Sequence, residues 1–145
     1  MKKYTQEEFD ALEVIEGTKI CPTGDYSQIK NFEEKCRFGG GCRFSEACSF
    51  GGLCSFGKSC SFGKLCSFGE WCRFSELCSF GKACSFGKLC SFGKSCSFGK
   101  ACRFGEKCSF GKECSFGKEC SFGKSCSFGK ACNVSEELRN LTIKK

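Results

Sequence analysis

Apolar residues recur every six positions along most of the chain. From Cys36 to Cys132 a cysteine occupies every sixth position without a gap, and from Phe38 to Phe128 a phenylalanine follows two positions behind. The repeating unit is C-[SR]-F-[GS]-[KEG]-x, so that Ser or Arg separates the two apolar residues. Residues i and i+2 of an extended chain point to the same side. The pattern therefore predicts a very short strand with Cys and Phe on one face.

The second half of each hexad predicts a corner. Gly or Ser at the fourth position lets the chain turn at little steric cost, and a charged residue follows. So short a strand cannot bury its apolar face alone, and the repeats must therefore coil and stack around a continuous core. A helix fits poorly, because a period of six would place a glycine in nearly every second turn at roughly 1 kcal/mol each. We therefore expect an all-β solenoid.

This unit resembles the hexapeptide-repeat left-handed parallel β-helix, whose motif is [STAV]-x-[LIV]-[GAED]-x-x. Cys takes the place of the small inward residue, Phe that of the large one, and Gly39, Gly51 and Gly57 stand at the turn. The resemblance implies a triangular coil of three hexads, or 18 residues. Phe at every large position differs from that family and demands more room in a narrow core. The alternative is the quadrilateral helix of pentapeptide repeats, whose period differs by one residue.

Both ends of the chain predict caps for the solenoid. Thr5 with Glu8 three residues later is a capping-box signature, which predicts a helix over residues 6–16 that Gly17 closes. At the other end, Ser135 predicts the start of a short C-terminal helix. Such segments cover the unpaired backbone of a terminal coil. The apolar residues on one side of these two helices are Phe9, Leu12 and Ile15, and Leu138 and Leu141.

The hexad pattern continues in a degraded form toward the N-terminus. Residues 21–26 fit the hexad with Cys21 and Thr23 inward, and residues 27–32 fit it with Ser27 and Ile29 inward. Residues 33–35 then form an insertion. The predicted division of the chain is a cap at 1–20, degenerate repeats at 21–35, the solenoid at 36–134 and a C-terminal cap at 135–145.

The composition excludes several kinds of chemistry. The chain has 18 Cys among 145 residues and no His. Catalysis by a Ser-His-Asp or Cys-His arrangement is therefore excluded, and so is zinc bound by His. The enzymes of the resembling family, the hexapeptide acyltransferases, use a histidine base, so the resemblance does not extend to their activity. We expect a protein that is not an enzyme.

The high number of regularly spaced cysteines needs a structural explanation. No apolar run near the N-terminus predicts a signal peptide, and no stretch is long enough to span a membrane. We therefore expect a cytoplasmic protein with buried free thiols. Stacking of one coil on the next would bring Cys54 and Cys72 to about 4.8 Å, so disulfide ladders are one alternative. A metal or cluster site is the other, but C-x-x-C spacing is absent, and we expect neither metal ligands nor a cofactor.

When the sequence is folded at three hexads per coil, its lysines form rows. The net charge is +7, and the fifth hexad position on one face gives the candidate basic stripe Lys64, Lys82, Lys100 and Lys118. Solubility and protection against aggregation are one interpretation of these rows. Binding of a polyanion is the other, although lysines about 4.8 Å apart do not register with phosphates spaced roughly 3.4 Å along one strand. A second face carries Lys94, Lys112 and Lys130.

A third face carries a column of large apolar residues, Leu53, Trp71 and Leu89, beside alternating charges. Contiguous exposed apolar residues are typical of an interaction surface. The helix predicted at 6–16, with its apolar side, is one candidate cover. A second copy of the chain, giving a homodimer, is another, and a bare column is the third.

Arginine adds a longer period to the hexads. Arg43, Arg73 and Arg103 recur at every fifth hexad, each followed by Phe and, two positions later, by Glu. Five hexads do not divide into coils of three, so these residues should lie on successive different faces. We interpret the period as the trace of a duplication.

These observations favour a non-enzymatic β-solenoid that serves as a structural or protein-interaction module. Its partner would be a protein that the sequence does not identify, or a second copy of the chain. A cysteine-based metal-binding or redox protein is one alternative. A module that binds a polyanion through the lysine rows is the other, and none of these interpretations involves a membrane.

Overall fold

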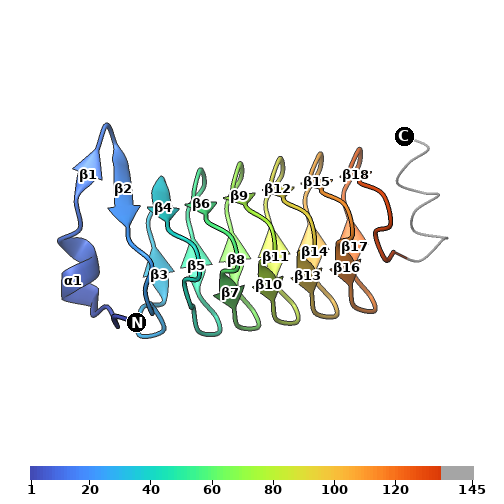
Figure 1. Ribbon diagram of the computed structural model, residues 1–145. Helices are drawn as coiled ribbons and strands as arrows, with labels where there is room; N and C mark the ends of the chain where they lie inside the picture. The colour runs from blue at the N-terminus through green and yellow to red at the C-terminus, as the bar shows by residue number, and fades with distance from the viewer. Residues whose placement is uncertain (135–145) are drawn as a thin grey trace.

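The computed structural model describes residues 1–134, which form a parallel β-solenoid of about six turns with 18 residues per coil. The coils are stacked along one axis, with a short helix at the N-terminal end (Figure 1). Three sheets run along the stack, and in the regular coils strands three hexads apart in the sequence are paired in parallel. The predicted fold class and coil length are confirmed. The quadrilateral alternative is wrong, since the strands form three sheets.

From β6 (Ser55–Phe56) to β17 (Ser121–Phe122), each 18-residue coil contributes one strand to each sheet, and most strands are only two residues long. The eight-stranded sheet contains β1 (Val14–Ile15), β2 (Thr18–Cys21), β4 (Cys36–Phe38), β6 (Ser55–Phe56), β9 (Arg73–Phe74), β12 (Ser91–Phe92), β15 (Ser109–Phe110) and β18 (Ser127–Phe128). The four-stranded sheet contains β7 (Ser61–Phe62), β10 (Ser79–Phe80), β13 (Ser97–Phe98) and β16 (Ser115–Phe116). The six-stranded sheet contains β3 (Asn31–Phe32), β5 (Ser49–Phe50), β8 (Ser67–Phe68), β11 (Ser85–Phe86), β14 (Arg103–Phe104) and β17 (Ser121–Phe122).

Backbone hydrogen bonds join each coil to the coils on both sides of it. In the four-stranded sheet, Ser79 N donates to Cys60 O at 3.0 Å, which joins β10 to the preceding coil. At the neighbouring corner, Leu77 N donates to Lys94 O of the following coil, also at 3.0 Å. The short strands are therefore held in register by bonds between coils, because two residues cannot form a stable sheet by themselves.

Phenylalanine rings fill the interior in three stacked columns. Phe80 is nearly parallel to Phe62 and Phe98 of the adjacent coils, with ring centroids 4.8 and 4.9 Å apart. It meets Phe74 and Phe86 of the flanking hexads edge to face, at 5.0 and 5.1 Å. Offset-stacked and edge-to-face contacts are the arrangements that aromatic pairs prefer. This packing explains how a narrow triangular core accommodates Phe at every large position.

The backbone conformation at the corners differs from the one that the sequence predicts. The left-handed backbone conformation lies at the sixth hexad position, as in Leu65 (φ +63°) and Trp71 (φ +66°), and not at the glycine. The glycine is instead favoured because two coils approach closely there: a Cβ added to Gly81 on the present backbone would lie 2.6 Å from the backbone N of Lys64. Ser45 and Ser75 stand at the equivalent position in their hexads, so this place accepts small residues in general.

Helix α1 (Gln6–Asp10) closes the N-terminal end of the core. The predicted capping box of Thr5 and Glu8 is confirmed, and Phe9 is 1% exposed with its ring edge to face with Phe32 at 5.2 Å. The predicted length of the helix is wrong, because residues 14–21 form the hairpin β1–β2. Glu16 and Gly17 both have positive φ at the turn, which suits a two-residue hairpin loop. Within residues 1–134, no helix has the length and apolar character that crossing a bilayer requires.

The register predicted for the first repeats is also wrong. Lys19 pairs with Cys36 and Cys21 with Phe38, so Cys21 occupies the large inward place. Tyr26 stacks on Phe44 and therefore takes the large place that the sequence assigned to Thr23. Residues 30–35 are a regular hexad containing β3, and not a repeat followed by an insertion. The helix predicted after Ser135 lies outside the described residues.

Lys19 explains part of this register change. Its side chain is buried, and its Nζ donates hydrogen bonds to the carbonyl oxygens of Phe9 and Asp10 at 2.9 and 3.2 Å. The same ammonium group lies 4.5 Å from the centre of the Phe9 ring and 3.5 Å from a carboxylate oxygen of Glu33. Carbonyl groups at the end of a helix need such a donor, so Lys19 fixes α1 on the end of the solenoid.

Candidate functional site

Each hexad exposes its fifth and sixth residues at a corner, and the three corners differ in chemistry. The first corner joins the eight-stranded sheet to the four-stranded sheet, the second leads from there to the six-stranded sheet, and the third closes the coil. The fifth positions of the first corner are Gly40, Lys58, Glu76, Lys94, Lys112 and Lys130. Those of the second corner are Glu46, Lys64, Lys82, Lys100 and Lys118, and those of the third are Glu34, Gly52, Glu70, Lys88, Glu106 and Lys124.

The four-stranded sheet is bordered by lysines on both sides. We call this surface the basic face: the four-stranded sheet, the lysines of the first corner (Lys58, Lys94, Lys112, Lys130) and those of the second corner (Lys64, Lys82, Lys100, Lys118). All eight lysines are exposed. Among residues 1–134, none of them forms an ion pair or a side-chain hydrogen bond. The surface between them carries serines, one from each strand of the sheet.

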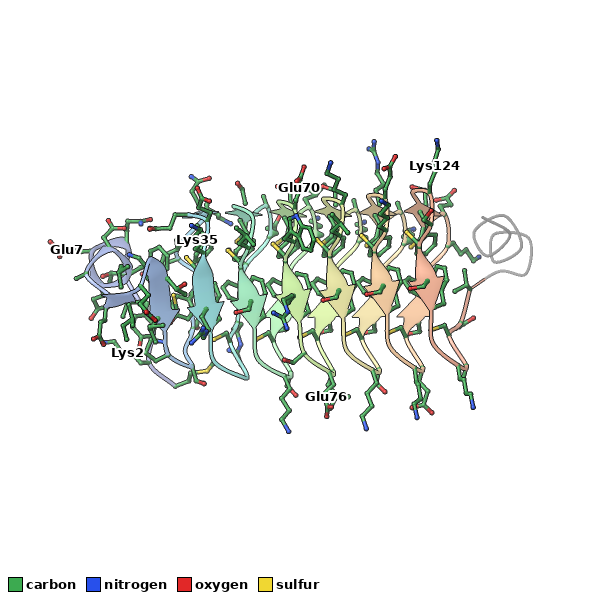
Figure 2. All side chains as sticks on the ribbon, turned by 90° about the horizontal axis from the view of Figure 1, so that it is seen from above. Lys2, Glu7, Lys35, Glu70, Glu76 and Lys124 are labelled. Atoms are coloured by element: carbon green, nitrogen blue, oxygen red, sulfur yellow. The ribbon has the colours of Figure 1, made fainter. Side chains whose placement is uncertain are left out.

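The sequence predicts both lysine rows, but the sheet that lies between them was not inferred from it. Following the hexads in order around a three-hexad coil would have shown this, because the first and second corners enclose the same strand. The third corner carries mixed charges instead. Figure 2 shows Glu70 and Lys124 along one edge of the solenoid and Glu76 along the opposite edge.

The apolar column lies on the third corner. Leu53 and Trp71 are 51% and 52% exposed, and Leu89 is partly buried. The expectation that the N-terminal helix covers these residues is wrong, because Phe9 of α1 packs against Tyr26 and Phe32 at the end of the solenoid. Leu65 and Leu77 are also exposed, on the second and first corners. The column is therefore bare in the single chain.

The cysteine side chains have a hydrogen-bonding role that the sequence did not reveal. In one hexad after another, the thiol donates to the carbonyl oxygen of the fourth residue of a hexad in the preceding coil. Cys78 Sγ lies 3.4 Å from Gly57 O, and Cys84 Sγ lies 3.4 Å from Gly63 O. The residue at this place must be small and must donate a hydrogen bond, and Cys meets both requirements. The cysteines from Cys21 to Cys126 are free thiols in the structure.

Replacing Cys78 by alanine tests this role. The substitution leaves the carbonyl group of Gly57 without its donor in a buried place, so the free energy of unfolding should fall by about 1 to 3 kcal/mol. Denaturant unfolding of Cys78→Ala and Cys78→Ser measures the effect. Serine keeps a donor at the same place and should recover part of the loss. Equal stability of Cys78→Ala and the parent protein would contradict the assigned role.

The fold and its core define a class of protein: a β-solenoid repeat protein with Cys and Phe columns inside and charged corners outside. The sequence model of the RNA-binding, Nab2-type zinc finger family matches six segments, which together span more than half of the chain. The chain belongs to this family. No curated protein and no solved structure matches it. The matched segments are residues 35–51, 47–63, 59–75, 77–93, 95–111 and 113–129.

The residues present do not fit a zinc ion of the Cys₃His type. The chain contains no histidine to serve as the fourth ligand. In the first matched segment, Cys36, Cys42 and Cys48 precede or begin strands on three different sides of the coil, with Phe between them. The second segment shares Cys48 with the first, so two separate fingers would need the same ligand. Within residues 1–134, no three potential ligands are grouped so as to hold a metal ion.

Proposed function

We propose that the protein is a non-enzymatic RNA-binding module that contacts the phosphates of a single strand through its basic face. The observation that carries this proposal is the pair of lysine rows on the two borders of the four-stranded sheet. Eight exposed ammonium groups without partners create a positive potential along the solenoid. The description of the matched family as RNA-binding supports the same ligand.

The arrangement favours a single strand over a duplex. Lysines in one row repeat with the coil spacing of about 4.8 Å, whereas each strand of a duplex advances roughly 3.4 Å along the helix axis per phosphate. A rigid duplex therefore cannot keep its phosphates opposite successive lysines. The backbone of an unstacked strand can adjust its spacing to the row.

Recognition through this surface would be independent of base sequence. Many proteins that bind single strands also stack bases on exposed aromatic rings. Within residues 1–134, the strongly exposed aromatic side chain is Trp71, and it lies on the third corner, away from the basic face. Contacts would then be made mainly to phosphates, which hold a strand without reading its sequence.

The proposal also covers the lack of catalysis, the cellular location and a second binding surface. The resemblance to the hexapeptide-repeat left-handed β-helix supports a repeat scaffold, and the lack of histidine argues against the acyltransferase activity found in that family. A cytoplasmic location agrees with free thiols. The bare column of Leu53 and Trp71 offers a second surface, for a protein partner or a second copy of the chain. The metal-binding alternative lacks a suitable donor set, so we do not extend the proposal to it.

Removing lysines from the basic face should weaken RNA binding more than removing them from the third corner. The double variant Lys82→Gln/Lys100→Gln should bind a fluorescent single-stranded RNA about tenfold more weakly at low salt. The slope of log K against log salt is negative, and its magnitude should decrease by about 1.4 because two phosphate contacts are lost. Fluorescence anisotropy at several salt concentrations measures both quantities.

The matched control is Lys88→Gln/Lys124→Gln, which makes the same charge change at the same hexad position on the third corner. This variant should keep most of the affinity and the slope. Equal losses in the two double variants would mean that net charge alone drives binding, and the basic face would not be the site. No binding by the parent protein at low salt would reject RNA as the ligand.

A further inference from the structure

A shallow groove lies on the outer surface of the eight-stranded sheet and adjoins the first corner, where the basic face begins. Its volume is about 520 Å³. The walls and floor come from the second hexad positions of four successive coils, which alternate between arginine and serine. The polar lining residues are Arg37, Ser55, Arg73, Ser75 and Ser91.

Two arginines stand in one column of this groove with a serine between them. Arg37 pairs with Ser55 and Ser55 with Arg73 in the parallel sheet, so the two arginines are two strand spacings apart, or roughly 9.5 Å. Both guanidinium groups are on long side chains that can reach the space above Ser55. An anion held there would be contacted from both sides.

The groove offers hydrogen-bond donors without competing carboxylates. Its lining contains two guanidinium groups and the hydroxyl groups of Ser55, Ser75 and Ser91, and it contains no Asp or Glu. Within residues 1–134, neither Arg37 nor Arg73 forms an ion pair or a side-chain hydrogen bond. The planar guanidinium fork matches the geometry of phosphate oxygens, and hydroxyl groups can donate to the remaining oxygens.

The other arginines at the same hexad position lack this pairing of two arginines across one serine. Arg43 pairs with Asp25 on its own sheet, and its positive charge contributes to the lowered pKa of that carboxyl group, after the larger effect of Ser27. Arg103 has serine on both sides, Ser85 and Ser121, and the position two coils before it is Ser67. Within residues 1–134, the paired arrangement is therefore particular to the eight-stranded sheet.

We propose that the groove between Arg37 and Arg73 is a binding site for a phosphate group. The two guanidinium groups would hold the phosphate oxygens from both sides, and Ser55 would donate to it from below. The phosphate could belong to an RNA backbone or to a small phosphorylated molecule, because both present the same oxygens. The site does not depend on RNA binding by the basic face, since it lies on another sheet with its own donors.

The variant Arg73→Ser tests the site with little risk to the fold, because serine is the commonest residue at this hexad position. Inorganic pyrophosphate is titrated into the full chain while the arginine Nε–H resonances are followed by NMR. In the parent protein the signals of Arg37 and Arg73 should shift together and saturate. Arg73→Ser should weaken pyrophosphate binding about tenfold or more, because one charged hydrogen-bonding partner is lost.

The matched control is Arg103→Ser, which removes the same charge from the same position of a similar hexad on the six-stranded sheet. It should leave pyrophosphate binding unchanged within about twofold. Equal weakening by Arg73→Ser and Arg103→Ser, or an absence of saturable shifts at Arg37 and Arg73, would overturn the proposal.

A competition experiment then identifies the source of the phosphate. If single-stranded RNA displaces pyrophosphate from Arg37 and Arg73, the site holds a backbone phosphate. If pyrophosphate remains bound in the presence of RNA, the site serves a small phosphorylated molecule. Either result supports a phosphate site. Failure of the lysine variants to affect RNA binding would reject the proposed function of the basic face and would leave the result for this groove standing.

Discussion

Raising the pH from 8 to 10 should unfold the protein. Hydrogen bonding between neighbouring thiols of one column lowers the pKa of some cysteines, such as Cys66 and Cys102. For many others, the same hydrogen bonding together with burial raises the pKa above its ordinary value. Because the same thiols ionise near pH 8.5 in the unfolded chain, the unfolded state releases protons first and is favoured as the pH rises. The cysteines for which these two causes raise the pKa include Cys48, Cys60, Cys84, Cys90, Cys114 and Cys126.

The expected size of this effect is large. Each such thiol lowers the free energy of unfolding by about 1.4 kcal/mol per pH unit above the unfolded pKa, so several of them together give a steep loss of stability. The total stability of a domain is typically about 5 to 15 kcal/mol. The cysteines with a raised pKa should therefore cause stability to be lost within one to two units above pH 8.5.

Denaturant unfolding at a series of pH values, in anaerobic solution with reductant, measures the slope. Circular dichroism and the ultraviolet absorbance of thiolates should change at the same pH, and both changes should reverse on return to pH 7. Thiolate absorbance that appears at pH 9 while the β-sheet signal remains would show that the thiols ionise in the folded protein, which would contradict this prediction.

Replacing Phe80 by alanine should cost about 3 to 5 kcal/mol of stability. The ring lies in the middle of one stacked column, and it touches rings in the adjacent coils as well as in the flanking hexads. The narrow core is filled by rings that are fixed by their own neighbours, so the cavity cannot collapse easily. Denaturant unfolding near pH 7 measures the loss.

The adjacent residue provides the control. Ser79 is exposed on the outer surface of the same strand, β10, so Ser79→Ala should change stability by less than about 0.5 kcal/mol. The same comparison can be made with Phe92 and Ser91. If the serine and phenylalanine variants were equally destabilised, the inward assignment of the phenylalanines would be wrong.

The regular part of the fold could be predicted from the sequence because its geometry repeats. One short strand such as Ser79–Phe80 determines where Cys78 and Phe80 point, and the need to bury that face determines the stacking. Once each coil is known to hold three hexads, the corner that carries Lys82 and the corner that carries Trp71 follow from counting. The lysine rows and the apolar column could therefore be predicted from the hexad period and the coil length alone.

The irregular features could not be predicted because they depend on contacts between coils. Lys19 occupies a cysteine place because it reaches the end of α1, a contact that no local pattern reveals. The left-handed conformation at Leu65 and Trp71 arises in residues with no special tendency toward it, so composition gave no signal. The groove at Arg37 and Arg73 requires two residues from coils that are not adjacent to share one column. In each case the controlling neighbour is distant in the sequence.

The three-sided coil restricts which insertions and deletions leave the surface of this protein continuous. Loss or gain of one hexad would keep every Cys and Phe in the core, so the interior would remain intact. However, all residues beyond the change would rotate by one side of the triangle, and a lysine row such as Lys82, Lys100 and Lys118 would continue on a different corner. Only insertions or deletions of three hexads leave the outer surfaces continuous. Selection on the surface should therefore favour length changes by whole coils, although the core alone would accept changes by single hexads.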